Sequence, residues 1–170
     1  MQTPTNLGYR TVSNHEFAVR RQKITNGQNA LFTLRSYQPG EIIADFSAGT
    51  ISAEPTYLTV QVGMAKHITL QPEFLQYINH SCDPNVFFDT TTMQLVALKL
   101  LQPEVEMTFF YPSTEWEMTQ CFHCYCGSDH CLGEIKGAAY LSKEAQEKYR
   151  LTDFIQQQLT KRKRSTRKVA

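Results

Sequence analysis

The stretch YINHSCDPN, residues 77–85, places a single cysteine among polar side chains and a proline. Cys82 is the only cysteine in the first 120 residues, and the other four lie together in CFHCYCGSDHC at 121–131. Closely spaced cysteines are typical of zinc sites, in which four thiolate or imidazole ligands surround the metal. The sequence therefore raises the question of whether the later cluster binds a metal alone or together with Cys82.

The length and composition predict one folded domain. The chain has 170 residues, of which 41% are hydrophobic and 11% aromatic, and this excludes wholesale disorder. No apolar run approaches the roughly 20 residues that span a bilayer, and no charged-then-apolar leader begins the sequence. We therefore expect an intracellular protein, in which clustered cysteines bind metal more often than they form disulfides.

The net charge of +1 hides an uneven distribution. Residues 161–170 hold six of the 17 Lys and Arg residues and no acid, so the rest has 11 bases against 16 acids, a net charge of −5. An acidic body favours basic peptides over nucleic acid as partners. We interpret the basic tail as a solvated, mobile end, with nuclear import or nucleic-acid contact as the alternative.

Short strands are predicted from about Phe17 to Tyr111, because β-branched or apolar runs alternate there with turn residues such as Pro39 and Gly40. The expected strands are 30–34, 42–46, 56–63, 67–70, 86–90, 95–101 and 106–111. One or two helical turns are expected at 72–79. This pattern predicts a mainly β or α+β fold, with little room for βαβ crossovers.

A C-terminal helix is expected over 138–160, with Ser142 as its N-cap. Apolar residues recur along it at a rough spacing of 3.6 residues. They are Ala145, Tyr149, Leu151, Phe154, Ile155 and Leu159. We expect this stripe to pack on the body of the domain.

Two sets of zinc ligands fit the cysteine spacing. Both contain the C-x-C-x4-C residues Cys124, Cys126 and Cys131. The fourth ligand is either Cys121, which would complete a local knuckle and which spacing slightly favours, or the remote Cys82. His123 and His130 are interpreted as surface residues of the loop.

Four motifs follow one another in a familiar order. They are PGEIIADFSAG (39–49), YINHSCDPN (77–85), EMTFFY (106–111) and CYCGSDHCLGEIKG (124–137). In turn they resemble the kGExIxEYxGE, hINHSCxPN, ELTFDY and C-x-C-G-x3-C-x-G-x-I-x-G motifs of SET-domain protein lysine methyltransferases with a post-SET zinc segment. The resemblance covers about residues 17–137.

The resemblance implies a SET fold of several small sheets, with a pseudoknot in which the stretch YINHSCDPN (77–85), the family signature, threads beneath a neighbouring loop. The implied parts are an N-terminal segment (1–16), the SET domain (17–112), a linker and post-SET zinc segment (113–137), the C-terminal helix (138–160) and the basic tail (161–170). In this family the signature supplies the fourth zinc ligand. The implied zinc ligands are therefore Cys82, Cys124, Cys126 and Cys131, and Cys121 is left as a spare thiol.

The resemblance also implies S-adenosylmethionine as the methyl donor and assigns roles to individual residues. Tyr111 matches the catalytic tyrosine that orients the substrate amine. Phe109 matches a residue that limits the number of methyl groups, and a phenylalanine there predicts di- or trimethyl-lysine. The implied cofactor-binding residues are Asn29, Ala30, Asn79, His80 and Phe122. A lysine amine must lose its proton before transfer, which an apolar channel favours.

Several positions depart from the family pattern. Asn29 or Ala30 stands where the family usually has the second glycine of a G-x-G. Phe46 replaces a tyrosine that often lines the lysine site, Phe110 replaces an aspartate, and Gln76 replaces an arginine. These changes predict an altered substrate pocket.

Three classes of function remain open from the sequence. The favoured class is methyl transfer to a lysine of a basic protein, such as a histone tail. The second is an enzyme of the same fold that acts on a non-protein substrate, and the third is a non-catalytic, zinc-stabilised interaction module. Cofactor binding separates the third class from the others, and the identity of the methyl acceptor separates the first two.

Overall fold

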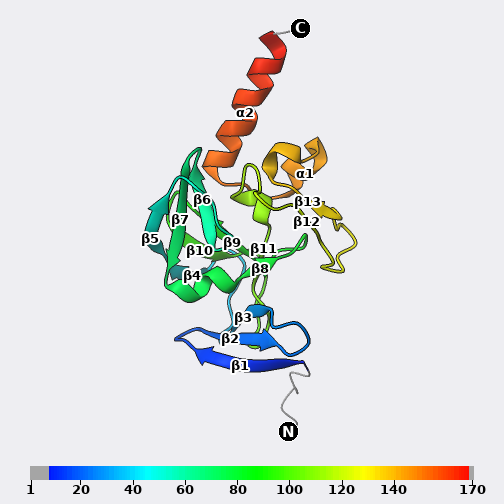
Figure 1. The fold of residues 1–170 in the computed structure, drawn as a ribbon. Helices are drawn as coiled ribbons and strands as arrows, with labels where there is room; N and C mark the ends of the chain where they lie inside the picture. Colours follow the sequence, from blue (N-terminus) through cyan, green and yellow to red (C-terminus); the bar gives the residue numbers. More distant parts are fainter. Residues whose placement is uncertain (1–7, 169–170) are drawn as a thin grey trace.

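The computed structural model describes residues 8–168. Within that range the chain forms small sheets of two or three strands, joined by loops and short 3₁₀ helices, and two α-helices follow near the C-terminus (Figure 1). The expected mainly β fold of several small sheets with a C-terminal helix is confirmed.

The first sheet is antiparallel and lies at one end of the molecule. Its strands are β1 (Tyr9–Asn14), β2 (Ala18–Lys23) and β3 (Asn29–Thr33), in the order β1-β2-β3. The sequence did not predict β1 or β2, and β1 lies in the expected N-terminal segment (1–16). The two arginines of β2 made this segment look too charged for a strand. In the structure Arg20 stacks on the Tyr77 ring at 3.9 Å and Arg21 pairs with Glu104 at 2.5 Å, so partners distant in sequence accommodate both charges.

Two further sheets surround the main core. One has the order β5-β7-β6, from β5 (Ser47–Ser52), β7 (Lys66–Gln71) and β6 (Thr59–Gly63). The other has the order β4-β10-β9, from β4 (Ile42–Asp45), β10 (Gln94–Ala97) and β9 (Val86–Asp89). Their inward side chains pack with Leu75 of the 3₁₀ helix η1 (Glu73–Tyr77), which realises the helical turn expected at 72–79.

A two-residue parallel ladder brings the signature beside a later segment of the chain. β8 (Asn79–His80) pairs with β11 (Thr108–Phe109), and Asn85 reinforces the contact. The Asn85 side chain donates to the Glu106 carbonyl at 2.8 Å and accepts from the Thr108 backbone N–H at 2.8 Å. The signature is thereby fixed against the strand that leads to Tyr111.

Another two-stranded sheet belongs to the cysteine-rich segment. It pairs β12 (Phe122–His123) with β13 (Glu134–Ile135) in antiparallel fashion, so the chain between these strands forms a closed loop. That loop carries Cys124, Cys126 and Cys131.

The C-terminal region differs from the single helix expected at 138–160. It contains the 3₁₀ helix η3 (Ala138–Tyr140), α1 (Lys143–Lys148) and α2 (Asp153–Lys168). Ser142 caps α1 as expected, and its side chain accepts from the Ala145 N–H. The predicted stripe is largely buried, in a second core that contains Phe110.

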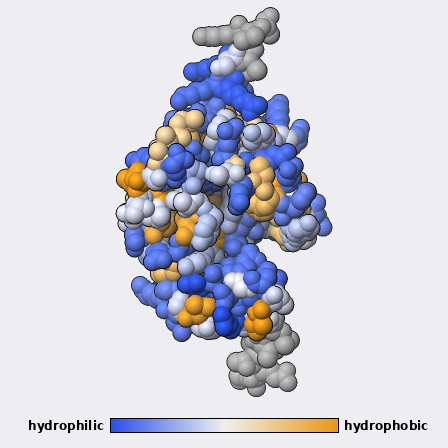
Figure 2. Space-filling model, viewed as in Figure 1, coloured by the Kyte–Doolittle hydropathy of each residue, from blue (hydrophilic) through white to orange (hydrophobic). Residues whose placement is uncertain are grey.

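The basic tail is not an irregular end, because α2 continues through it to Lys168. Figure 1 shows α2 projecting from the body at the end opposite to β1. Its described side chains at 161–165 are exposed, and the corresponding surface in Figure 2 is strongly hydrophilic. Among residues 8–168, no helix has the length and apolar character needed to cross a membrane.

Candidate active site and cysteine cluster

A cavity of about 620 Å³ lies between two segments that are distant in sequence. Residues 55–60 form one wall and residues 115 and 117–122 another, and Phe109 and Tyr111 also line the cavity. Leu70, Leu75, Ile78 and Phe88 add apolar surface. The volume falls in the usual range for small-ligand sites, and an apolar lining with a few polar groups is typical of them.

Phe109 and Tyr111 both face this cavity, whereas Phe110 points away from it. The rings of Phe109 and Tyr111 have their centroids 4.7 Å apart. Phe110 instead stacks on Tyr149 in the second core, with centroids 3.7 Å apart and planes at 13°. The alternation follows the side-chain period of an extended chain, although the regular strand ends at Phe109.

The expected strand at 106–111 is short because the backbone turns at Tyr111. This residue begins the 3₁₀ helix η2 (Tyr111–Ser113), and Pro112 has no N–H to extend a ladder. The Tyr111 N–H donates to Nδ1 of His80 at 3.2 Å rather than to a strand partner. Burial raises the pKa of Tyr111 to about 12, so the phenol keeps its proton at neutral pH.

Four of the expected cofactor-binding residues lie next to the cavity rather than in its lining. Asn79 donates its side-chain amide to the Asn29 carbonyl at 2.8 Å and to Glu106 Oε1 at 3.0 Å. Ala30 is 1% exposed and packs with Val19 and Phe32 on β2 and β3, so only its backbone could touch a ligand.

Tyr111 links this group to the cavity through two aromatic contacts. Its ring lies 5.2 Å from the His80 ring and 6.0 Å from that of Phe122, which is itself a lining residue. On the right of Figure 2 the surface is hollowed between the β1–β3 sheet and the region of the cysteine-rich loop. The structure therefore brings Asn29, Ala30, Asn79 and His80 together next to Tyr111, whereas Phe122 lies in the cavity lining.

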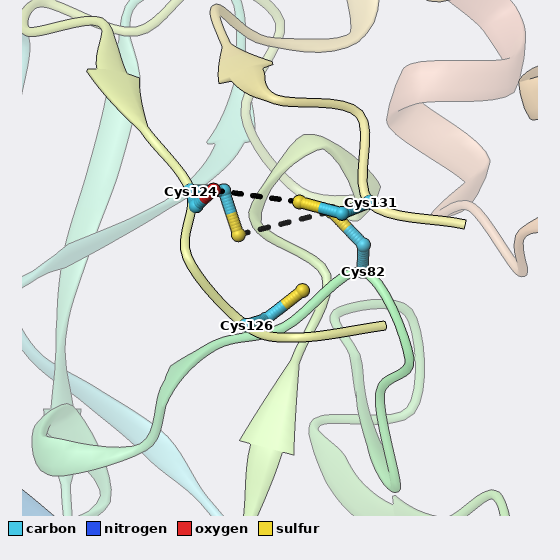
Figure 3. Close-up of side chains that lie close together, drawn as sticks. All are labelled: Cys82, Cys124, Cys126 and Cys131. Carbon is cyan, nitrogen blue, oxygen red and sulfur yellow. Dashed lines mark hydrogen bonds between the residues drawn. The ribbon is translucent and has the colours of Figure 1, made fainter. Parts of the chain in front are cut away.

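Four cysteines from two segments converge beyond Phe122. Cys82 comes from the signature, and Cys124, Cys126 and Cys131 come from the β12–β13 loop (Figure 3). All four Sγ atoms lie within 4.8 Å of one another. Cys121 is exposed and lies outside this group, as do the exposed His123 and His130. The geometry thus matches the remote ligand set and not the local knuckle.

The cluster has the donor set and spacing that zinc requires. A tetrahedron with Zn–S bonds of about 2.3 Å has sulfur–sulfur distances of about 3.8 Å, and the sulfurs of Cys82 and Cys124 are 3.9 Å apart. Burial raises the pKa of the Cys82 thiol to about 11, so a cation is needed to hold it as a thiolate near neutral pH. The Leu132 N–H also donates to the Cys82 sulfur at 3.4 Å, which favours negative charge there.

Sequence reasoning missed one polar residue of the cavity, Glu115. Its Oε1 accepts from the Gln61 N–H of β6 at 2.9 Å and from the Thr114 hydroxyl at 3.1 Å. The adjacent Trp116 N–H donates to the Gln61 side chain at 2.8 Å, so this polar clamp fixes the segment on the edge of β6. Trp116 itself packs on the second core and does not line the cavity. The only feature of the sequence that could have pointed to Glu115 was its position four residues after Tyr111.

The comparison with protein families agrees with this geometry. A family model described as "SET domain" matches residues 12–112. The chain belongs to the SET-domain family. Among curated proteins, "Methyltransferase flvH" of Aspergillus flavus is 36% identical over 118 residues, which are 68% of this chain. The matched region spans 66% of that relative's own length.

The matched region begins within β1 and ends just after Tyr111. The cysteine-rich loop and both α-helices follow it. Two departures from the family pattern lie outside the cavity lining, since Phe46 packs edge-on against Phe88 in the core and Phe110 joins the second core. Gln76 does line the cavity.

Proposed function

We propose that this protein transfers methyl groups from S-adenosylmethionine to lysine side chains of a basic protein, such as a histone tail. The observation that carries the proposal is the partly apolar cavity lined by Tyr111 and Phe109, with Tyr111 in contact with His80 next to Asn29 and Asn79. S-adenosylmethionine, when bound, supplies an activated methyl group on a sulfonium. The protein has to hold a neutral amine in line with that group, and orientation alone accounts for much of the acceleration.

Each residue contributes to binding or orientation. Asn79 and His80, with the backbone of Asn29 and Ala30, are suited to holding the cofactor because they present polar groups beside Tyr111. Phe122 would cover the cofactor from the cysteine-rich loop. The Tyr111 phenol, protonated at neutral pH, can direct its oxygen toward the amine and the methyl group that is transferred.

A basic acceptor fits the charge of the molecule. Residues 1–160 carry a net charge of −5, as counted above. Glu115 and Glu117 line the cavity, whereas the lining contains no Lys, Arg or His among the described residues. A cation entering such a site meets negative potential, which raises its local concentration and its association rate.

A transfer assay tests the proposal. The purified protein is incubated with S-adenosylmethionine labelled in its methyl group and with mixed histones, and the label in lysine is measured after hydrolysis. Incorporation into lysine supports the proposal, whereas label that appears only in small amines added to the same reaction would identify a non-protein acceptor.

Calorimetry with S-adenosylmethionine provides the second arm of the test. An enzyme of this kind binds the cofactor in the absence of acceptor. A chain that neither binds S-adenosylmethionine nor labels any acceptor would be a zinc-stabilised interaction module instead.

A further inference from the structure

Glu115 occupies an unusual position for an acidic side chain. It lines the cavity four residues after Tyr111, and its backbone N–H donates to the Tyr111 carbonyl at 3.0 Å. Its own carbonyl accepts from the Ala138 N–H at 2.8 Å. Gly137 permits this approach, because a side chain there would meet the Trp116 carbonyl at 2.6 Å and its φ is +116°. The backbone of Glu115 is thus held by hydrogen bonds to an earlier segment, at Tyr111, and to a later one, at Ala138.

The two carboxylate oxygens of Glu115 have different surroundings. Oε1 accepts two hydrogen bonds, from the Gln61 N–H and from the Thr114 hydroxyl. Oε2 accepts no hydrogen bond from residues 8–168. It is nevertheless not one of the fully buried polar atoms that lack a partner in that range. Oε2 therefore retains accessible surface, and the cavity is the space that Glu115 lines. One oxygen is used to hold the side chain, and the other is free to act on a ligand.

Methyl transfer to an amine creates a need for such an oxygen. A lysine side chain has a pKa of about 10.4 and enters the site as an ammonium ion. Only the neutral amine has the lone pair that attacks the methyl group. A group that removes the proton inside the cavity supplies this form at neutral pH, and positioned proton acceptors typically contribute about 10²- to 10⁴-fold in rate.

We propose that Glu115 is the proton acceptor of this site, and the proposal rests on the methyl-transfer function given above. The Oε2 atom takes a proton from the substrate ammonium, so that one N–H bond breaks, its electron pair stays on nitrogen and an O–H bond forms. In the methyl transfer that follows, an N–CH3 bond would form from the amine lone pair, while the S–CH3 bond of the sulfonium donor would break and leave its electron pair on sulfur as a thioether. The carboxylic acid releases its proton to solvent. A second or third methylation repeats the step, because each methylated ammonium must again lose a proton.

The electrostatic surroundings of Glu115 suit this role. Burial raises its pKa to about 7, against the hydrogen bonds from Gln61 and Thr114 that favour the charged form. The other titratable residues that line the cavity are Tyr57, Tyr111, Glu117 and Cys121. Gln61 of β6 and Ala138 of η3, which contact Glu115 from the neighbouring elements, are neutral. Burial and the Glu115 charge both raise the pKa of Tyr111 to about 12, so the phenol does not compete for the proton.

The experiment compares kcat/KM for methyl transfer to mixed histones between pH 6 and 10 in wild type and in Glu115→Gln. In wild type we expect kcat/KM to rise with pH through about 7, as the carboxylate forms. In Glu115→Gln we expect a roughly 10²-fold lower value at pH 7.5. The difference should shrink toward pH 10, where the amine loses its proton without help.

Two further variants isolate the carboxylate from effects of charge and shape. Glu117→Gln removes an exposed negative charge from the same cavity and should leave the rising limb near pH 7. Glu115→Asp retains a carboxylate and should recover part of the lost rate. Because glutamine can still accept from the Gln61 N–H, Glu115→Gln should melt at the wild-type temperature and bind S-adenosylmethionine as wild type does.

The outcomes separate this inference from the function on which it rests. If wild type labels histones and Glu115→Gln shows the same pH profile, Glu115 is not the proton acceptor. A rising limb that moves equally in Glu117→Gln would also overturn the assignment, because cavity charge alone would then explain it. If wild type labels no histone at any pH, the proposed function fails and the role of Glu115 fails with it.

Discussion

Three consecutive aromatic residues at 109–111 have three different environments. Phe109 contributes to both the main core and the cavity, Phe110 belongs to the second core, and Tyr111 contacts His80 at the cavity surface. An extended chain turns successive side chains to opposite faces, so a single short segment can pack two cores and still present a phenol to a ligand. A shift of one residue in this register would move Tyr111 out of the cavity.

The first prediction concerns the Tyr111 hydroxyl. Tyr111→Phe retains the ring and its contacts with Phe109 and His80, so the melting temperature should stay close to that of wild type. Methyl transfer should fall by about 10²-fold or more, which is typical of the loss of one well-placed active-site donor. Single-turnover assays with labelled cofactor measure the effect, and an unchanged rate would show that the phenol has no part in transfer.

A second prediction concerns the number of methyl groups added. Phe109 is 8% exposed and faces the same cavity as Tyr111, so its size and polarity affect the space around the substrate nitrogen. We expect wild type to form di- or trimethyl-lysine. Phe109→Tyr adds a hydroxyl that can hold a water molecule in this space, and the product should shift toward monomethyl-lysine. Mass spectrometry of the products under excess cofactor measures the shift, and wild type that stops at one methyl would contradict the prediction.

At the scale of elements, the C-terminal helices act as a brace on the signature. Tyr149, just after α1, stacks on Phe110 and donates its hydroxyl to the Cys82 carbonyl at 2.7 Å. The Thr152 N–H, just before α2, donates to the Ser113 carbonyl at 3.0 Å. These contacts explain why the helix predicted at 138–160 is interrupted at 149–152, since a continuous helix could not make both.

A third prediction tests this brace. Tyr149→Phe keeps the stacking but loses one buried hydrogen bond, so the free energy of unfolding should fall by about 1 kcal/mol. Tyr149→Ala also removes the ring, and the loss should reach about 3–5 kcal/mol. Urea denaturation measures both. Equal stability of the two variants would mean that the ring contributes nothing to the packing.

At the scale of the whole molecule, the cysteine cluster joins the SET domain to the segment that follows it. Cys82 lies at 0% exposure in the signature, while its three partners lie on the β12–β13 loop that also positions Phe122. A metal at this point would hold one wall of the cavity against the body. Metal loss should therefore affect ligand binding as well as stability.

The fourth prediction follows from this connection. Cys82→Ser should lower the zinc content and the affinity for S-adenosylmethionine together, because three cysteines alone leave the site incomplete. Cys121→Ser, which changes an exposed thiol outside the cluster, serves as the matched control and should keep its zinc. Elemental analysis and calorimetry give the two readouts, and the opposite pattern of zinc loss would assign the metal to a local knuckle.

Local patterns in the sequence predicted the elements whose partners are also local. The strands at 59–63, 66–71 and 86–89 agree closely with their β-branched and aromatic runs. The sequence missed β2, since its arginines are satisfied by Tyr77 and Glu104 from far along the chain, and it missed β5, whose residues are small and polar. Glu115 escaped notice for a similar reason. Its significance depends on Gln61, which lies 54 residues earlier.

The two walls of the cavity also determine when the site can exist during synthesis. A ribosome releases residues 55–60 before residues 115–122, so the second wall of the cavity is the later one to emerge. A nascent chain that has already folded the signature and Tyr111 is still open on one side. It stays inert until β13 has emerged and the loop can reach Cys82. Chains that terminate before residue 115 lack one wall of the cavity and three of the four clustered cysteines, so they should be inactive.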